Sequence, residues 1–249
     1  EPEQVAKHAV PLLVASALNS TAALHALLTH THFAAWLSSL VLTSEFELVR
    51  EKAIEGVYQI CKSVRDGLEP GQLPTNVLLQ QLLYYLSGIT PTTRTCAQYF
   101  DLVNRLLQDA CSGVGGASPR QFKSLLLTCT EMIHRHPIVE TGAHPEVEDQ
   151  VLIGLMNLVT TLISKDHDFK TLAGLPVSQG GGDLVSQVFY QCLFEIPEPS
   201  HAKQAVTPPR CKSLASRGGA FKLLEELARN HPDNLKQLIY RLIAQHNLA

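Results

Sequence analysis

The side chains best suited to covalent chemistry in this sequence are its cysteine thiols, because a thiolate held beside an imidazole can act as a nucleophile. The densest cysteine–histidine neighbourhood joins Cys129 to His134 and His136. Cys129 belongs to an apolar run with helical spacing, and burial in such a run raises the pKa of a thiol and makes it inert. We therefore interpret Cys129 as a packing residue and predict no catalytic residue in this chain.

The cysteines also indicate the redox environment. Six are spread along the 249 residues without a CxxC motif, namely Cys61, Cys96, Cys111, Cys129, Cys192 and Cys211. A secreted disulfide framework needs denser cysteines in a smaller chain. We expect all six to be reduced, mostly buried thiols in a cytoplasmic or nuclear protein.

Metal and phosphate sites are the other chemistry that residue spacing could indicate. His30 and His32 are two residues apart, as are His134 and His136, and side chains at that spacing do not share a helix face. Because a closed zinc site needs four converging ligands, we interpret these histidines as helix ends and turns and predict no metal ligand. The glycine run 180–182 lacks the Lys-Ser/Thr of a P-loop. We interpret it as a flexible joint and predict no cofactor.

Composition and charge exclude several classes of protein. Hydrophobic residues make up 45% of the chain, which rules out a disordered protein, and a net charge of −3 provides no general surface for nucleic acid. The basic residues Arg210, Lys212, Arg217 and Lys222 are interpreted as a solvated face or a protein contact. The longest nearly uncharged stretch, residues 9–43, contains histidines and many hydroxyl side chains, which is typical of soluble helices rather than of a membrane span.

Apolar residues recur at helical spacing along most of the chain. The clearest helix begins at Ser44, which is predicted to form a capping box with Glu47, and an apolar stripe from Phe46 to Val64 follows. Proline favours the first position of a helix, and three further helices are predicted to begin at Pro119, Pro145 and Pro232. The helix after Pro145 is apolar nearly all round, so we expect neighbouring helices to enclose it.

The remaining predicted helices complete a total of about eleven. They are Val5–Leu18, Thr21–Thr29, Thr31–Leu42, Asn76–Leu86, Thr92–Cys111, Gly182–Phe194 and Ser213–Arg229. Trp36 is expected to pack in the core between the first helices.

Consecutive amphipathic helices with short joints are typical of an α-solenoid. We predict an all-α fold of armadillo- or HEAT-like stacked helices, forming a single elongated domain over residues 1–249, with a compact irregular bundle as the alternative. Residues 165–182 and 196–210 contain the glycines and prolines typical of loops and are expected to be mobile. Because the chain begins without Met and ends in a helical run, we expect it to be a fragment of a larger protein.

Three segments near the C-terminal end resemble a known family. Residues 208–227 contain the pattern C-K-S…S-R…A-F…L-L, residues 232–235 read P-D-N-L, and residues 188–194 precede a proline-rich loop. Together they resemble the armadillo-like region that precedes the catalytic domain in giant ubiquitin-specific proteases of the fat-facets type. The resemblance lies mainly within residues 183–240, and Gly218-Gly219 stands where such helices more often carry Ala.

The resemblance implies a parent enzyme but no catalytic residue here. Enzymes of that family are cysteine deubiquitinases, with a cysteine box reading approximately G-x-T-C-Y-x-N and a histidine box ending near G-H-Y. Neither box occurs in this chain, so the catalytic residues cannot be placed on any position. The resemblance therefore implies a non-catalytic arm of a thiol protease, a ubiquitin carboxyl-terminal hydrolase. Its partners would be proteins, namely substrates, adaptors or ubiquitin, and the oligomeric state is left open.

Two other functions stay open from the sequence. One is a generic α-solenoid scaffold unrelated to ubiquitin, and the other is a self-contained helical enzyme with a cysteine nucleophile. The prediction taken forward is an interaction region that positions substrates or partners for a catalytic domain outside this chain. Because a solenoid binds through an extended groove, no individual binding residue is predicted.

Overall fold

The computed structural model describes most of the helical segments of the chain. The described residues are 2–44, 46–67, 81–82, 94–109, 119–134, 145–193, 196–197, 206–207, 211 and 213–248. They fall into two compact units, each described by itself below. Unit 1 combines residues 1–89 with 98–125, and unit 2 combines residues 90–97 with 126–249.

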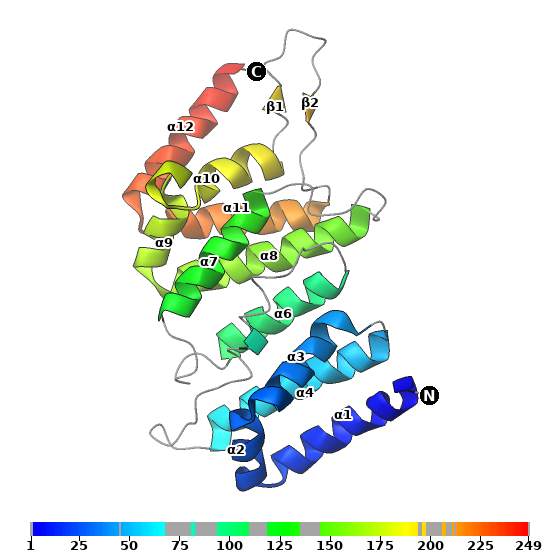
Figure 1. Ribbon diagram of the computed structural model, residues 1–249. Coiled ribbons are helices and arrows are strands. Elements are labelled where there is room, and N and C mark those ends of the chain that lie inside the picture. The colour runs from blue at the N-terminus through cyan, green and yellow to red at the C-terminus, as the bar shows by residue number, and fades with distance from the viewer. Residues whose placement is uncertain are drawn as a thin grey trace. The chain divides into compact units, whose positions relative to one another are not determined.

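The predicted all-α fold class is confirmed. Eleven α-helices account for most of the described residues, together with one short 3₁₀-helix, one π-helix and one pair of two-residue strands (Figure 1). This helical content is consistent with the expected solenoid class. The armadillo-like repeat and the single elongated domain over residues 1–249 stay predictions. No helix in the described part of the chain is both long and apolar enough to cross a bilayer.

Unit 1 is built around helix α4 (Glu47–Gly67). Helices α1 (Pro2–Leu18) and α3 (Thr31–Thr43) both pack against α4, and α2 (Thr21–Thr29) connects them. The seam between α1 and α4 requires glycine at one position, because a Cβ on Gly56 would lie 2.7 Å from Cγ2 of Val14. The two backbones therefore approach closely, with Val10 and Val57 buried in the same unit.

Helices α6 (Arg94–Asp109) and α7 (Pro119–His134) each contribute residues to both units. Within unit 1, the guanidinium carbon of Arg105 lies 4.1 Å from the ring centre of Tyr58 in α4, which is a cation–π contact. The hydroxyl of buried Tyr99 donates a hydrogen bond to the carbonyl of Leu82.

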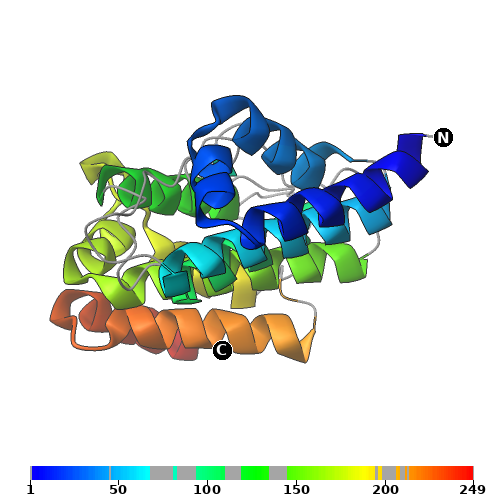
Figure 2. The same ribbon diagram turned by 90° about the horizontal axis from the view of Figure 1, so that it is seen from below.

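Unit 2 has helix α8 (Pro145–Lys165) at its centre. Helix α11 (Leu214–Ala228) runs alongside α8, as both views show (Figures 1 and 2). The prediction that neighbours enclose α8 is confirmed, because the apolar residues along it are completely buried. These residues are Val151, Leu152, Leu155, Met156, Val159, Leu162 and Ile163.

The other elements of unit 2 follow in chain order. They are α9 (His167–Gly174), the 3₁₀-helix η1 (Val177–Gln179), α10 (Leu184–Gln187), the π-helix η2 (Val188–Leu193), β1 (Ile196–Pro197), β2 (Val206–Thr207) and α12 (Pro232–Leu248). The two strands pair antiparallel, with Ile196 opposite Thr207. Helix α9 contacts α8, α10 and α11, and α12 contacts α10 and α11.

The expectation of a loop over residues 165–182 is wrong for much of its length, because α9 and η1 occupy it. Asp166 caps α9, since its side chain accepts a hydrogen bond from the backbone N–H of Asp168 at 2.9 Å. The helix is short and buries only Lys170, Ala173 and Gly174, so it offers little apolar periodicity to find. Of residues 196–210, the structure describes only the two strands.

The predicted capping box at Ser44 and Glu47 is also wrong. The hydroxyl of Ser44 accepts from the N–H of Phe46 at 3.3 Å, Ser44 ends α3, and α4 begins at Glu47. The predicted stripe is confirmed at Val49, Ala53, Val57 and Ile60, whose side chains are buried, but Phe46 is 41% exposed.

Three further expectations differ from the structure or lie outside it. Trp36 is 38% exposed beside Phe33, because Leu37 and other small or aliphatic residues of α3 take the buried positions. The helix predicted over 182–194 is a short α-helix that continues as a π-helix. Of the helix predicted over 76–86, only residues 81–82 are described.

Candidate functional site

The described cysteines are buried thiols, as expected. Burial raises the pKa of the Cys129 thiol in α7 far above its ordinary value. A hydrogen bond with Cys192, followed by burial, raises the pKa of the Cys211 thiol. Both thiols are therefore protonated at neutral pH and are poor nucleophiles. Reduced, buried thiols are confirmed for the five described cysteines, and Cys111 lies outside the described residues.

The cysteine–histidine neighbourhood in α7 does not form a nucleophile–base pair. Cys129 is fully buried, whereas His134 in the last turn of the same helix is exposed. The two side chains therefore leave the helix on different faces. His136 lies outside the described residues.

The histidines interpreted as helix ends are found at helix ends. His30 caps α3, because its Nδ1 accepts from the N–H of Phe33 at 3.3 Å. His32 lies beside it, with 5.8 Å between the ring centres. Among the described residues, no group of three or more His, Cys, Asp or Glu side chains could hold a metal ion. For the whole chain, the absence of metal and cofactor sites stays a prediction.

The glycine run 180–182 forms a hydrogen-bonded turn. Gly180 closes η1 with a φ of 75°, a conformation that glycine adopts readily. The N–H of Gly181 donates to the carbonyl of Pro176, and the N–H of Gly182 donates to the carbonyl of Leu172. These N–H groups are therefore committed to the chain's own carbonyls and are not presented to an anion.

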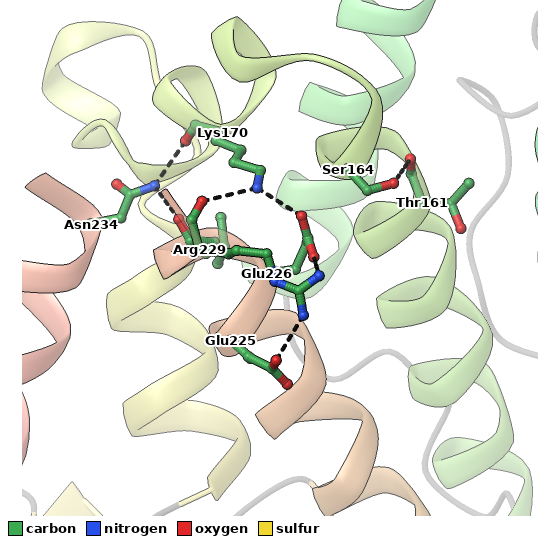
Figure 3. Close-up of polar contacts among 8 residues, drawn as sticks. Thr161, Ser164, Lys170, Glu225, Glu226, Arg229 and Asn234 are labelled. Atoms are coloured by element: carbon green, nitrogen blue, oxygen red, sulfur yellow. Dashed lines mark hydrogen bonds and ion pairs between the residues drawn. The ribbon is translucent and has the colours of Figure 1, made fainter. Parts of the chain in front are cut away.

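A cluster of polar side chains in unit 2 lies where α9, α11 and α12 meet. We call it the α9–α12 junction and define it by Lys170, Thr171, Glu226, Arg229, His231 and Asn234. Lys170 Nζ donates to Glu226 Oε1 at 2.7 Å and to the carbonyl of Arg229 at 3.1 Å (Figure 3). The Lys170 and Glu226 side chains are only 10% and 11% exposed. A lysine of α9 thus serves both a carboxylate and a carbonyl near the end of α11.

Arginine 229 extends the cluster towards solvent. Its guanidinium lies 3.2 Å from Glu226 Oε2 and 2.7 Å from Glu225 Oε1. The Arg229 side chain is 56% exposed, so its contribution is screened by water, unlike the buried pair of Lys170 and Glu226.

Asparagine 234 fastens the first turn of α12 to both neighbours. Its Nδ2 donates to the carbonyl of Lys170 at 3.1 Å and to the carbonyl of Leu227 at 3.0 Å (Figure 3). A Cβ on Gly174 would lie 1.9 Å from Asn234 Oδ1, so the last residue of α9 must lack a side chain. The missing side chain at Gly174 therefore leaves room for the side-chain amide of Asn234 between α9 and α11.

Histidine 231 caps α12 from within the junction. Its carbonyl accepts from the N–H of Leu235, and its Nδ1 accepts from the N–H of Asn234 at 3.3 Å. Its Nε2 lies 3.0 Å from Thr171 Oγ1, and its ring stacks on that of His167 with 4.9 Å between centres. Burial, followed by the charge of His167, lowers the pKa of His231 below its ordinary value. The prediction of a helix boundary at His231 is confirmed.

These contacts indicate a structural role for the junction. Its lysine, carboxylate and imidazole are each engaged by other groups of the chain. The Thr171 hydroxyl, which lies 3.0 Å from His231 Nε2, donates its own proton to the carbonyl of His167, so the imidazole is not placed to take that proton. Sequence reasoning missed the junction because Lys170 and Glu226 are 56 residues apart. The only local signal was His231-Pro232, a pair typical of a helix start.

The outer side of α12 exposes apolar side chains. Leu235, Ile239, Leu242 and Ile243 are 44%, 46%, 49% and 53% exposed, and their spacing of four, three and one places them on one helix face. Asn234 and Arg241 face the body of unit 2 instead, since Asn234 is buried and Arg241 contacts Ser186 of α10. Contiguous exposed apolar surface of this kind is typical of interaction sites.

Comparison with known proteins connects these features to a protein class. The chain is 28% identical over 234 aligned residues to ubiquitin carboxyl-terminal hydrolase puf of Drosophila melanogaster, and the alignment covers 88% of this chain. It is 24% identical to human ubiquitin carboxyl-terminal hydrolase 34 and 23% identical to its mouse counterpart, with 98% of this chain covered in each case. The chain resembles a segment of a giant ubiquitin carboxyl-terminal hydrolase.

The similarity is broader than the sequence motif alone. It extends along most of the chain, whereas the motif near Cys211 covers mainly residues 183–240. The chain spans only 6–7% of the length of these hydrolases. No protein-family model matches the chain. No solved structure matches it.

Proposed function

We propose that this chain is a non-catalytic helical region of a large cysteine deubiquitinase. In that role it positions substrates or partners for a catalytic domain located elsewhere in the polypeptide. The observation that carries the proposal is the alignment with ubiquitin carboxyl-terminal hydrolases, which covers 88–98% of this chain. These hydrolases are many times longer than the chain. A generic scaffold unrelated to ubiquitin is the alternative, and the names of these relatives favour the deubiquitinase.

The state of the thiols supports a non-catalytic role. A cysteine protease needs a thiolate activated by a nearby base, whereas the pKa values of Cys129 and Cys211 are raised. The sequence also lacks the cysteine and histidine boxes of ubiquitin-specific proteases. Catalysis therefore belongs to another part of such an enzyme.

The surface supports an interaction role. The exposed apolar face of α12 provides contact area that the described residues of this chain do not cover. The partners would be protein substrates or adaptors of the deubiquitinase, with ubiquitin itself as a candidate. The cytoplasm, with the nucleus as a second location, suits a chain with reduced thiols.

The proposal is tested with three proteins, namely the isolated chain, a full-length deubiquitinase and its deletion variant, and with two kinds of substrate. The 249-residue chain alone is expected to show no hydrolysis of ubiquitin-rhodamine, because the described thiols are buried. A full-length deubiquitinase that contains this region is expected to keep that activity when the region is deleted. The same deletion is expected to slow cleavage of ubiquitin from folded protein conjugates.

Two results would contradict the proposal. Turnover by the isolated chain that disappears on replacing one of its cysteines would make it an enzyme in its own right. Equal cleavage of every protein conjugate with and without the region would remove its role in positioning substrates.

A further inference from the structure

We propose that His231 is a proton-sensitive cap that couples the docking of α12 onto α9 to pH. The proposal concerns how α12 is held in place and is independent of the proposed function. It follows from the two hydrogen-bonding contacts of this buried imidazole, in which Nδ1 accepts from the N–H of Asn234 and Nε2 lies beside the hydroxyl of Thr171.

Hydrogen bonds fix the tautomer of His231. The N–H of Asn234 donates to Nδ1 at 3.3 Å, so Nδ1 carries no proton and Nε2 carries one. The Nε2–H then donates to Thr171 Oγ1 at 3.0 Å, and the hydroxyl of Thr171 donates to the carbonyl of His167 at 3.3 Å. The result is a chain of hydrogen bonds from the first turn of α12, through His231, to the first turn of α9.

A second proton breaks this chain at its first bond. Both ring nitrogens of an imidazolium are donors, so Nδ1 can no longer accept from Asn234. The positive charge also lies at the N-terminus of α12, where the partial charge of the helix is positive. His231 is 6% exposed, so water cannot readily replace the lost acceptor.

Of the charged groups around His231, His167 and Lys170 oppose the imidazolium and Asp233 favours it. From α9, His167 stacks on the ring and Lys170 adds a positive charge. From α11, Glu226 is bound to Lys170 and to the guanidinium of Arg229. From α12, Asp233 favours protonation but is 81% exposed and lies near Lys236. The carboxylates of the junction are therefore engaged or solvated.

These contacts determine whether the His231 cap stabilises the protein more at high or at low pH. The pKa of His231 is lower in the folded protein than in the unfolded chain, so the unfolded chain binds more protons below the ordinary histidine pKa of about 6.5. The stabilisation by the cap is complete above that pH and is lost as pH falls towards the folded pKa. Mild acid therefore loosens α12, the helix that carries the exposed apolar face.

The test compares wild type with His231→Asn by hydrogen exchange of the α12 amides at pH 7.5 and pH 5.5. Asparagine is a good cap that does not titrate in this range, so it keeps an acceptor for Asn234. In wild type, the α12 protection factors are expected to fall on acidification, by up to about tenfold for each pH unit between the folded and unfolded pKa. In His231→Asn they are expected to stay constant.

A matched control and a second measurement complete the test. His134→Asn removes an exposed histidine from α7 and is expected to leave the acid-induced loss of α12 protection unchanged. An equal loss of protection in wild type and His231→Asn would overturn the proposal. If His231→Asn does not fold, NMR titration of the wild-type rings decides, because an ordinary His231 pKa would overturn the proposal equally.

Discussion

Lys170 in α9 and Glu226 in α11 form a buried ion pair, with 2.7 Å between Nζ and Oε1. Burying two charges is costly unless both are paired and hydrogen-bonded, and here Nζ also bonds the carbonyl of Arg229 while Glu226 also contacts the Arg229 guanidinium. The short helix α9 is therefore attached to α11 by polar contacts as well as by packing. This explains why a segment with little apolar periodicity holds a defined position in unit 2.

Removing one partner of the pair is expected to destabilise the protein strongly. Glu226→Gln leaves the Lys170 ammonium buried with a neutral amide and a carbonyl, which is expected to cost about 3 kcal/mol in the free energy of unfolding. Urea unfolding measures the loss. The exposed neighbour provides the control, because Glu225 is 67% exposed and Glu225→Gln is expected to cost about 0.5 kcal/mol or less. Equal effects of the two variants would contradict a buried pair.

Two glycines of unit 2 are expected to respond to alanine in opposite directions. A Cβ on Gly174 would overlap Asn234 Oδ1 at 1.9 Å, and Asn234 cannot move without giving up its hydrogen bonds to Lys170 and Leu227. Gly174→Ala is therefore expected to destabilise the protein by about 2 kcal/mol or more, a typical cost of overpacking. Thermal unfolding measures the change.

Gly218 in α11 is the matched control. Apart from its chain neighbours and the backbone of its own helix, no atom lies within 4 Å of the position that its Cβ would take, and Gly218 is exposed. Gly218→Ala is expected to stabilise the protein by about 0.5–1 kcal/mol, because alanine is the better helix former. A loss of stability on Gly218→Ala would indicate a contact that the described residues do not contain.

The sequence predicted the elements that local patterns determine. Pro145 starts α8 and Pro232 starts α12, because proline fixes a helical φ where no N–H bond is needed. The buried positions of α8 follow from its continuous apolar pattern, and Cys129 follows from the apolar run around it. In each case the physical cause lies within one helix of sequence.

The sequence could not predict what distant residues determine. Lys170 is polar, so only its pairing with Glu226 explains its burial. Ser44 matches the sequence pattern of a capping box, but in the structure it follows the last residue of α3. Its hydroxyl accepts a hydrogen bond from the N–H of Phe46. The outward face of α12 has the same apolar spacing as a core stripe, and only the packing of Asn234 and Arg241 shows which side faces unit 2.

The described cysteines are expected to react slowly with iodoacetamide in the native protein. Raised pKa values and burial keep the thiols of Cys129 and Cys211 protonated and shielded. Peptide mass spectrometry after timed alkylation measures each site, and the urea-unfolded chain, in which every thiol is accessible, is the control. One described cysteine that reacts much faster than the others would identify an activated thiolate and contradict this expectation.

Two leucines of α11 are expected to differ sharply when each is replaced by alanine. Leu223 is fully buried, so Leu223→Ala removes apolar contacts and leaves a cavity, at an expected cost of about 2–5 kcal/mol. Leu214 in the first turn is 88% exposed, so Leu214→Ala is expected to change stability by about 0.5 kcal/mol or less. Both variants keep a strong helix former in the same helix, so propensity does not explain a difference. Similar midpoints of urea unfolding for the two variants would show that α11 does not pack on unit 2 through the face that carries Leu223.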